Sequence, residues 1–571
     1  MSRSSRSSRS SLSTPSLPLD RRTLLRLGAG VGLGVAAAPL LTACGGSGAA
    51  TEKASVKSGS LLPNTILRDL GITPDHPGTA QGVPQGFSRY PAKPVRSVPG
   101  TPLKGAKAIT ASLETFKPPA PGRDRNAAWQ EIEKRLGTTV DIQAVAADDW
   151  PTKFSTMVAS DTLTDIFMYP ETGGVDHKAA FLAAKCADLT PYLSGDRIKD
   201  YPNLAAIPKG AWQGSIYGGK LYGIPIARAG TGGAGYYRHD LFAAAGVTSL
   251  DQIDDVDRFF ELCKELTRPK GKQYAIAAGV TTLIAMSYGA PYYWRMDATT
   301  GKFTLDLETD EYRAAIEMAA KLYKAGCYYP GTVQMSGAQK AQYTDLFKNG
   351  RAAYVFDGWP AYLTPSTGYL DAMAAIDPTY DVRPMTPIGK DAVAWNNNAR
   401  LSESFVRKAD AGRVREILQL ANWVAAPFGS EEYTLLAYGV EGTDHERDGK
   451  GAPILTEQGS QDVAVPWQLM ASATPALYSA TNAQGVKHLH DAYARLIPKM
   501  TPDPTSSYSS PTWDSKSSGT LNTLKGDWIK DIVTGRKPMS SYDGLVKEYR
   551  AKGGDQARRE FEEAAQKGTK Q

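Results

Sequence analysis

The sequence predicts an α/β protein built around a parallel sheet, because strand and helix patterns alternate from residue 108 onward. Residues 108–113 (Ala-Ile-Thr-Ala-Ser-Leu) predict a first strand. Further strands are expected around Val140 and over residues 165–169, and a helical pattern precedes each of them. Strand, helix, strand, helix and strand at this spacing indicate parallel strands joined by crossover helices.

Apolar side chains at helical spacing indicate the two crossover helices. In residues 126–136 these are Trp129, Ile132 and Leu136, and Gly137 supplies a C-terminal stop. The second helix carries Trp150, Phe154, Met157 and Val158. We assign Trp129 and Trp150 to core packing, together with Trp423 and Trp528, because all four fit apolar helical faces.

The first residues have the marks of an export signal. Residues 20–26 (Asp-Arg-Arg-Thr-Leu-Leu-Arg) form a twin-arginine signature, and an apolar run follows over residues 27–40. This run has 14 residues, five of them Gly or Pro, which is short for a bilayer core of about 30 Å. An N-terminal membrane-anchor helix is the alternative. Paired arginines also occur in Sec signals, so Tat and Sec export both stay open.

The signal ends in a sequence that resembles the bacterial lipobox. Residues 41–45 are Leu-Thr-Ala-Cys-Gly, in which Cys44 would be acylated and become the new N-terminus. Two or more acyl chains anchor a protein stably. We therefore expect residues 1–43 to be a twin-arginine-type lipoprotein signal peptide. The rest of the chain is then expected on the extracellular face of the cell membrane, with the membrane as a partner through Cys44.

The positive charge of the chain is concentrated in this signal. Residues 1–43 contain six Arg and one Asp, a net of +5 out of +6 for the whole chain. The remaining part carries about +1, so the charge does not favour a nucleic-acid partner.

Residues 44–104 have the composition of a tether, first rich in Gly and Ser and then in Pro. The Pro-rich half contains Phe87 and Tyr90. These aromatic residues leave open the alternative that this half lies along the folded body as an ordered arm.

Three cysteines follow Cys44, namely Cys186, Cys263 and Cys327. An odd number leaves at least one free thiol. Cys263 and Cys327 either pair or stay reduced and buried, and the sequence leaves both possibilities open. No CxxC motif or metal-ligand spacing is present, and we expect no cofactor and no metal.

Four blocks of sequence carry a family resemblance. They are residues 129–137 with 163–166, residues 217–225 (Tyr-Gly-Gly-Lys-Leu-Tyr-Gly-Ile-Pro) with 235–246, residues 347–359, and residues 438–444. In this order they resemble the family 1 extracellular solute-binding proteins, the binding subunits of ABC importers, although His239 stands where Lys is usual. Residues 438–444 (Tyr-Gly-Val-Glu-Gly-Thr-Asp) are similar to a segment of the lipoprotein subgroup that resembles LipO and YtcQ.

The resemblance implies a type II periplasmic binding protein, in which two α/β lobes joined by hinge crossings close on a ligand. On this basis the N-terminal lobe is expected to comprise residues 105–227 plus 346–392. The C-terminal lobe is expected to comprise residues 228–345 plus 393–571. The first crossing is expected at residues 226–235, where a Gly-rich run suits a hinge, with a plain surface loop as the alternative.

The resemblance also implies a monomer that captures a solute and passes it to ABC permease subunits. Aromatic rings beside polar groups favour a carbohydrate, because rings pack on sugar C–H faces and polar groups bind hydroxyls. Candidate ligand-binding residues of this kind follow strands or lie in polar loops: Tyr169, Glu171, Trp294, Asp357, Trp359, Trp395, Asn397 and Trp513. Tyr236, from the second family block, is added to them.

Two other functions have different sequence requirements. A secreted glycoside hydrolase needs two carboxylates flanking the scissile bond, but no motif places such a pair. No Gly-x-Ser-x-Gly, His-Glu-x-x-His or P-loop motif occurs either, so we expect no enzyme. A lipoprotein that senses a sugar and signals through a membrane partner has the same sequence features as an importer subunit, and this alternative stays open.

Overall fold

The computed structural model describes residues 61–569, which belong to the unit formed by residues 55–571. Within this range it does not describe residues 67, 80, 172, 173, 176, 336–338, 366, 397, 398, 474, 502, 507 and 509. The expected signal peptide, Cys44 and the first part of the expected tether lie outside the described residues.

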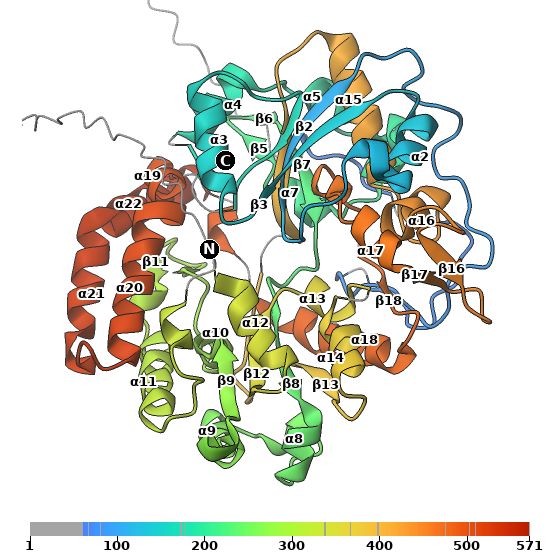
Figure 1. Ribbon diagram of the computed structural model, residues 1–571. Coiled ribbons are helices and arrows are strands. Elements are labelled where there is room, and N and C mark those ends of the chain that lie inside the picture. Colours follow the sequence, from blue (N-terminus) through green and yellow to red (C-terminus); the bar gives the residue numbers. More distant parts are fainter. Residues whose placement is uncertain are drawn as a thin grey trace, which may run out of the picture. The chain divides into compact units, whose positions relative to one another are not determined.

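The first lobe is built on a five-stranded mixed sheet (Figure 1). Its order is β3-β2-β4-β15-β7, with β2 (Ile109–Thr115) parallel to both β3 (Val140–Ala146) and β4 (Ile166–Met168). β15 (Arg400–Val406) runs antiparallel to β4 and to β7 (Gly223–Ala227). The parallel βαβαβ unit predicted from residue 108 onward is therefore confirmed.

Helices α2 (Ala127–Leu136) and α3 (Trp150–Ala159) are the two predicted crossovers. The Asn126 side chain caps α2 by accepting from Trp129 N at 2.8 Å, and Gly137 ends the helix with a φ of +85°. Their buried faces join one core with α4 (Lys178–Lys185), α15 (Ala411–Val424) and α16 (Glu431–Tyr438). Trp150 and Trp423 are buried in it, as predicted.

The second lobe has a four-stranded sheet of order β13-β8-β12-β9. β12 (Ala352–Asp357) is parallel to β9 (Tyr274–Ala278) and antiparallel to β8 (Ala234–Arg238), which also pairs with β13 (Val382–Met385). The helices of its cores include α8 (His239–Ala244), α9 (Val256–Leu266), α10 (Val280–Ser287), α11 (Asp310–Lys324), α12 (Lys340–Lys348), α14 (Tyr369–Ile376) and α18 (Ala483–Leu496).

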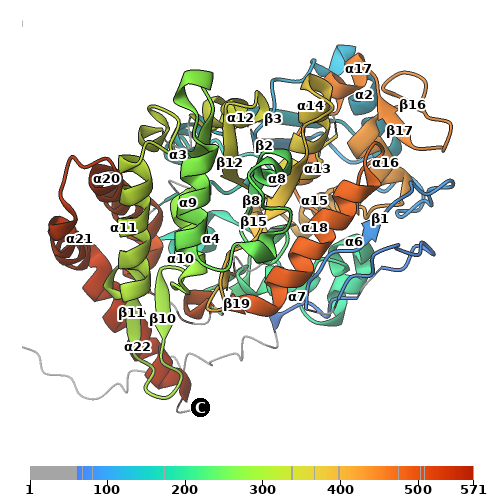
Figure 2. The ribbon, with the colours of Figure 1, turned by 90° about the horizontal axis from the view of Figure 1, so that it is seen from below.

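The C-terminal helices belong to this second lobe, as expected. They are α19 (Pro511–Lys516), α20 (Asn522–Val533), α21 (Tyr542–Tyr549) and α22 (Asp555–Thr569). α20 packs against α11 and α21 (Figure 2). Phe561 of α22 stacks on Phe303 with ring centroids 5.2 Å apart.

The sheet pairings correct the expected lobe boundaries. Residues 346–392 were assigned to the N-terminal lobe, yet their strands β12 and β13 pair with β8 of the second sheet. Conversely, β15 lies within the segment assigned to the C-terminal lobe but pairs with β4 and β7 of the first sheet. The reason is that the chain returns to the first lobe only after β13, and it stays there through the buried residues of α15 and α16.

The chain passes between the two sheets three times. The first crossing, between β7 and β8, falls where the sequence predicted it. The second lies between β13 and β15, and the third follows Ala471, the last residue of the first-lobe core. Isolated bridges join Thr231 to Asn396 and Ile226 to Ser472, so the three crossing segments lie side by side.

Residues 61–104 are not a free tether, which corrects that expectation and confirms the alternative of an ordered arm. Phe87 and Tyr90 are buried in a cluster with Phe428, Tyr438 and Tyr478. β1 (Gly86–Phe87) pairs in parallel with β18 (Leu477–Tyr478). Burial of each large apolar side chain contributes about 1.5–3 kcal/mol, which offsets the entropy cost of ordering the arm.

Cys186, Cys263 and Cys327 are all free and buried. In the structure Cys263 and Cys327 therefore stay reduced and buried and do not form a disulfide.

Candidate functional site

Polar side chains stand at the carboxyl ends of strands in both sheets. Glu114 is near the end of β2, Glu171 follows β4, and Asp357 ends β12. In open α/β sheets, ligands bind outside the carboxyl ends of the strands. This edge of each sheet is therefore where a site is expected.

Charged groups from the two lobes influence each other at these edges. Desolvation raises the pKa of Glu171, whereas Arg228 of the first crossing and Lys340 of α12 lower it. In the same way, burial raises the pKa of Asp514 in α19, and Lys178 at the start of α4 lowers it. Both carboxylates are nevertheless exposed to solvent. This combination is expected when a side chain faces a second protein surface across water.

We call the residues that meet in this way the interlobe face: Glu171, Lys178, Arg228, Lys340, Asp357 and Asp514. Glu171 and Asp514 form no hydrogen bond or ion pair through their side chains with any described residue. Among the described residues, the Arg228 guanidinium donates only to the carbonyl of Ala227, at 2.9 Å. Glu171, Arg228 and Asp514 are consequently available to a ligand.

Glu114 is a buried carboxyl that the sequence analysis did not single out. It is 6% exposed, and its Oε2 atom has no hydrogen-bond partner among the described residues. Burial, together with the neighbouring Glu171 and Asp148, raises its pKa to about 8. No cation among the described residues lowers the pKa of Glu114, and two further acidic residues stand beside it at the edge formed by β2, β3 and β4. The only sequence signal was an acidic residue at the end of an apolar strand.

Asp357 and Trp359 are fixed by their surroundings. Asp357 accepts from Tyr369 Oη at 2.8 Å and forms an ion pair with Lys340. The Trp359 indole donates to Thr231 O at 3.1 Å and to Thr231 Oγ1 at 2.8 Å, and its ring lies 4.1 Å from that of Tyr493. Trp359 is 4% exposed, so it ties the first crossing to α18 and offers little open ring surface.

The predicted residues Tyr236 and Trp294 lie in the cores of the second lobe. Tyr236 stacks on Tyr362 at 5.5 Å and donates to Gly358 O at 3.2 Å. Both side chains are at most 1% exposed, which leaves them no surface for a ligand in this conformation. We therefore assign them to packing.

The structure brings Trp395 and Trp513 into one aromatic cluster with Tyr292 and Tyr293. The ring centroid of Trp395, in the second crossing, lies 5.2 Å from that of Tyr292. The ring centroid of Trp513 lies 5.3 Å from that of Tyr293. The Trp395 indole donates to Ala290 O at 2.8 Å, which fixes its ring. Tyr292 is 38% exposed, and Tyr293 has a φ of +58°, a strained value for a bulky residue. This cluster adjoins Asp514 and offers ring surface to solvent.

Tyr169 lies beside Glu171 but is mostly buried. Its hydroxyl accepts from Val175 N at 3.0 Å, and Lys178 Nζ stands 4.1 Å from its ring centre. Lys178 also forms an ion pair with the buried Glu403 at 3.2 Å. Tyr169 therefore helps to position Lys178. Asn397, another predicted residue, lies outside the described residues.

A pocket of about 240 Å³ lies at the carboxyl end of β9. Its lining comes from the start of α10, from Tyr328 and Thr332, from Tyr343 of α12 and from Lys530 of α20. Burial and the charge of Asp357 raise the pKa of Tyr343 to about 12. Because Tyr343 lines the pocket and the charge of Asp357 acts on it, the pocket lies beside the interlobe face.

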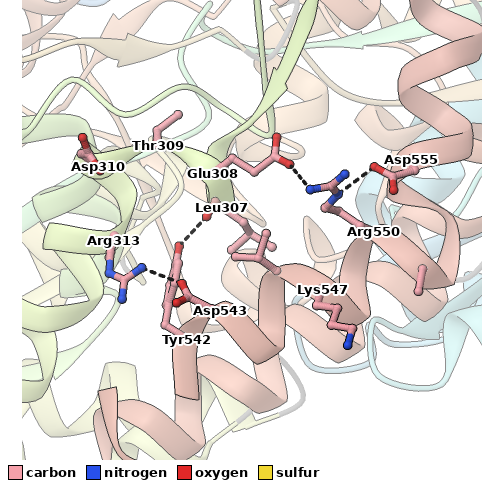
Figure 3. Close-up of a pocket in the computed structure, with 12 residues that line it drawn as sticks. Leu307, Glu308, Thr309, Asp310, Arg313, Tyr542, Asp543, Lys547, Arg550 and Asp555 are labelled. Carbon is pink, nitrogen blue, oxygen red and sulfur yellow. Dashed lines mark hydrogen bonds and ion pairs between the residues drawn. The ribbon is translucent and has the colours of Figure 1, made fainter. Parts of the chain in front are cut away.

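A larger pocket of about 550 Å³ lies between α11 and α21 (Figure 3). Figure 3 shows that its charged side chains largely neutralise each other: Arg313 meets Asp543 at 2.7 Å, and Arg550 meets Asp555 at 2.9 Å. None of the residues predicted to bind a ligand lines it. We interpret it as a packing groove of the C-terminal helices.

Within the described part of the chain, no group of three or more His, Cys, Asp or Glu side chains is arranged to hold a metal ion. In the same part, no helix combines the length and apolar character needed to cross a membrane.

Comparison with known proteins gives a family and a fold. The family model described as "Bacterial extracellular solute-binding protein" matches residues 127–433, more than half of the chain. The polygalacturonan/rhamnogalacturonan-binding protein YtcQ of Bacillus subtilis is 23% identical over 471 residues, covering 78% of this chain and 88% of YtcQ.

Two solved structures illustrate the similarity of fold. The HMO-binding, ABC-transporter-associated solute-binding protein of Bifidobacterium longum infantis has a TM-score of 0.58 at 13% identity, covering 81% of this chain and 99% of that one. The N-glycan transport solute-binding protein NgtS of Streptococcus pneumoniae has a TM-score of 0.58 at 16% identity, covering 81% and 98%. The chain therefore has the two-lobed α/β fold of type II periplasmic binding proteins.

Proposed function

Because the chain belongs to the bacterial extracellular solute-binding proteins, we propose that it captures an oligosaccharide between its lobes and delivers it to an ABC permease. One observation carries this proposal. Charged side chains of both lobes, Glu171 with Lys340 and Asp514 with Lys178, influence each other electrostatically across the face, and Asp514 follows Trp513 of the aromatic cluster. A sugar needs this combination, since its C–H faces pack on rings and its hydroxyls bind charged side chains.

The names of the relatives support a sugar as ligand. YtcQ is named for binding polygalacturonan and rhamnogalacturonan, and two solved neighbours are described as HMO-binding and as an N-glycan transport protein in complex with Man5GlcNAc. We extend the substrate class to this chain and propose an oligosaccharide. Within the site we propose Tyr169, Glu171, Asp357, Trp359, Trp395, Asn397 and Trp513 as contact or positioning residues.

The proposed mechanism involves no covalent chemistry. A ligand that touches the interlobe face from both sides makes more contacts when the lobes approach each other, so it favours the closed arrangement. The three adjacent crossings provide the axis of this motion. Trp359 supports the axis because its indole holds Thr231 of the first crossing. The chain then acts as a carrier and not as an enzyme.

The location of the protein is part of the proposal. We propose that Cys44 is acylated, that residues 1–43 are removed, and that the mature chain works as a monomer outside the cell membrane. The described part of the arm begins at residue 61. This leaves residues 44–60 as the segment between the lipid and the folded body.

A glycan panel tests the function. The mature chain without its lipid is incubated with neutral, acidic and amino-sugar oligosaccharides, and the melting temperature is measured. We expect at least one oligosaccharide class to raise the melting temperature and to bind in a calorimetric titration without being cleaved. Stabilisation by peptides alone would refute the substrate class, and cleavage of a bound sugar would refute the carrier role.

A further inference from the structure

The 240 Å³ pocket at the end of β9 has an uneven distribution of charge. Among the described residues that line it, Lys530 is the only charged one, and none is Asp or Glu. The Lys530 ammonium forms no ion pair or hydrogen bond with any residue that the structure describes. A half-buried cation without a counter-ion attracts an anionic group.

The backbone adds positive potential at the same place. Helix α10 begins at Val280, directly after Gly279, and no side chain caps its N-terminus. Gly279 has a φ of +74°, and a Cβ atom there would lie 2.4 Å from Phe356 Cβ, so glycine is required for this turn. The free N–H groups and the dipole of a helix N-terminus favour a negative charge.

Tyr328 supplies an independent sign of a missing partner. Its side chain lines the pocket, is 8% exposed, and its hydroxyl has no hydrogen-bond partner among the described residues. Burial raises its pKa; the Thr281 hydroxyl is near enough to oppose this but does not reach hydrogen-bond geometry. An unsatisfied buried hydroxyl costs about 1–3 kcal/mol, which a bound acceptor would recover.

We propose that this pocket binds the carboxylate of a uronic acid residue in the captured oligosaccharide. The inference rests on the proposed function and specifies its substrate class. Apolar side chains, among them Val280, Val333, Ile529 and Val533, line the rest of the pocket and suit the C–H face of one sugar ring. Lys530, Tyr328 and the N-terminus of α10 bind the carboxylate.

The opposite side of the interlobe face fixes the orientation of the ligand. Glu114, Glu171 and Asp148 line an edge whose carboxyl groups can hydrogen-bond the hydroxyl groups of a sugar. A chain with a uronate at one end and neutral sugars at the other binds in one direction.

The test compares matched ligands and matched variants by calorimetric titration of the mature chain. The ligands are oligogalacturonides, their methyl esters, neutral galacto-oligosaccharides of the same length, and inorganic phosphate. We expect the free acid to bind at least 10-fold more tightly than its methyl ester, in line with a charge-assisted hydrogen bond. Lys530→Met should weaken the binding of the free acid 10- to 100-fold and leave that of the ester unchanged, and Tyr328→Phe should weaken it by a smaller factor.

Two variants serve as controls. Lys530→Arg keeps the charge and should keep most of the affinity. Lys547→Met removes an exposed lysine of α21 outside the pocket and should have no effect. The melting temperature of unliganded Lys530→Met should match that of the unsubstituted chain, because Lys530 has no partner to lose.

The outcomes separate this proposal from the proposed function. If neutral oligosaccharides bind as well as the acids, or if Lys530→Met weakens both equally, the uronate pocket is refuted while the carrier function stands. If only phosphate binds, and does so through Lys530, the anion chemistry holds but the assignment to a sugar is refuted. If no sugar binds at all, both proposals fail.

Discussion

The buried carboxyl of Glu114 should make the stability of the protein fall as the pH rises. In the folded chain its pKa is about 8, above the ordinary value of 4.5. The folded state therefore holds this proton more tightly than the unfolded state does. The resulting stabilisation is complete below pH 4.5, and it decreases as the pH rises toward 8 because the buried group must then ionise. The difference between these two pKa values corresponds to a loss of about 4 kcal/mol in the free energy of unfolding at pH 8.

Glu114→Gln removes the ionisation and keeps the shape of the side chain. Any cost of burying the amide is the same at every pH, so the difference between the two pH profiles isolates the proton. We expect the unsubstituted chain to lose stability relative to Glu114→Gln by about 4 kcal/mol between pH 4.5 and 8, with most of the loss above pH 5.5.

The assay is chemical denaturation at half-unit pH steps, with thermal melting as a second measurement. Glu446→Gln, which removes an exposed carboxylate in β16 (His445–Arg447), serves as the control and should follow the unsubstituted profile. Parallel profiles for the unsubstituted chain and Glu114→Gln would refute the reasoning, because Glu114 would then ionise at the same pH in both states.

The other predictions concern the ligand, the arm and the anchor. Tyr292→Ala should weaken oligosaccharide binding about 3- to 10-fold in calorimetry, since an exposed ring is removed, and an unchanged Kd would exclude the aromatic cluster from the site. Arg228→Met should weaken it about 10-fold or more without lowering the melting temperature; a lower melting temperature with intact affinity would show a structural role instead. Phe87→Ala should lower the free energy of unfolding by about 3–5 kcal/mol, whereas Phe116→Ala, at an exposed position, should change it by less than about 0.5 kcal/mol. Equal effects of these two would contradict the ordered arm. Cys44→Ser should move the protein from the membrane fraction to the culture medium, and continued membrane retention would argue against the lipid anchor.

Local features of the fold were predictable because short-range rules determine them. The Gly137 stop and the buried faces of α2 and α3 follow from spacing alone. The hairpin of β5 (Ile216–Tyr217) and β6 (Lys220–Leu221) follows from its two glycines, which have φ values of +55° and +75°.

Sheet membership was not predictable in the same way. The sequence of β15 indicates a strand but not which sheet it joins, because its partners β4 and β7 are more than 170 residues away along the chain. The family resemblance indicated two lobes and the first crossing. It did not reveal that the chain completes the second sheet before it returns to the first.

In the candidate site, too, local sequence predicts some features, whereas others depend on tertiary packing. Aromatic residues beside polar ones located the regions of Trp395, Trp513 and Asp357, but not which rings stay open to solvent. Tyr236 and Trp294 are buried by partners distant in sequence. Glu114 and Tyr328 could not be found from sequence, because a buried polar group without a partner is a property of tertiary packing.

Small-angle scattering of the mature chain with and without its oligosaccharide tests most directly whether a ligand is held between the lobes. We expect the radius of gyration to decrease when the sugar saturates the protein, because the ligand draws the two faces together. We also expect Arg228→Met to need a higher sugar concentration for the same decrease. Tight binding of the sugar with no change in the radius of gyration, in the unsubstituted chain and in Arg228→Met, would contradict binding between the lobes. The sugar would then occupy one lobe alone.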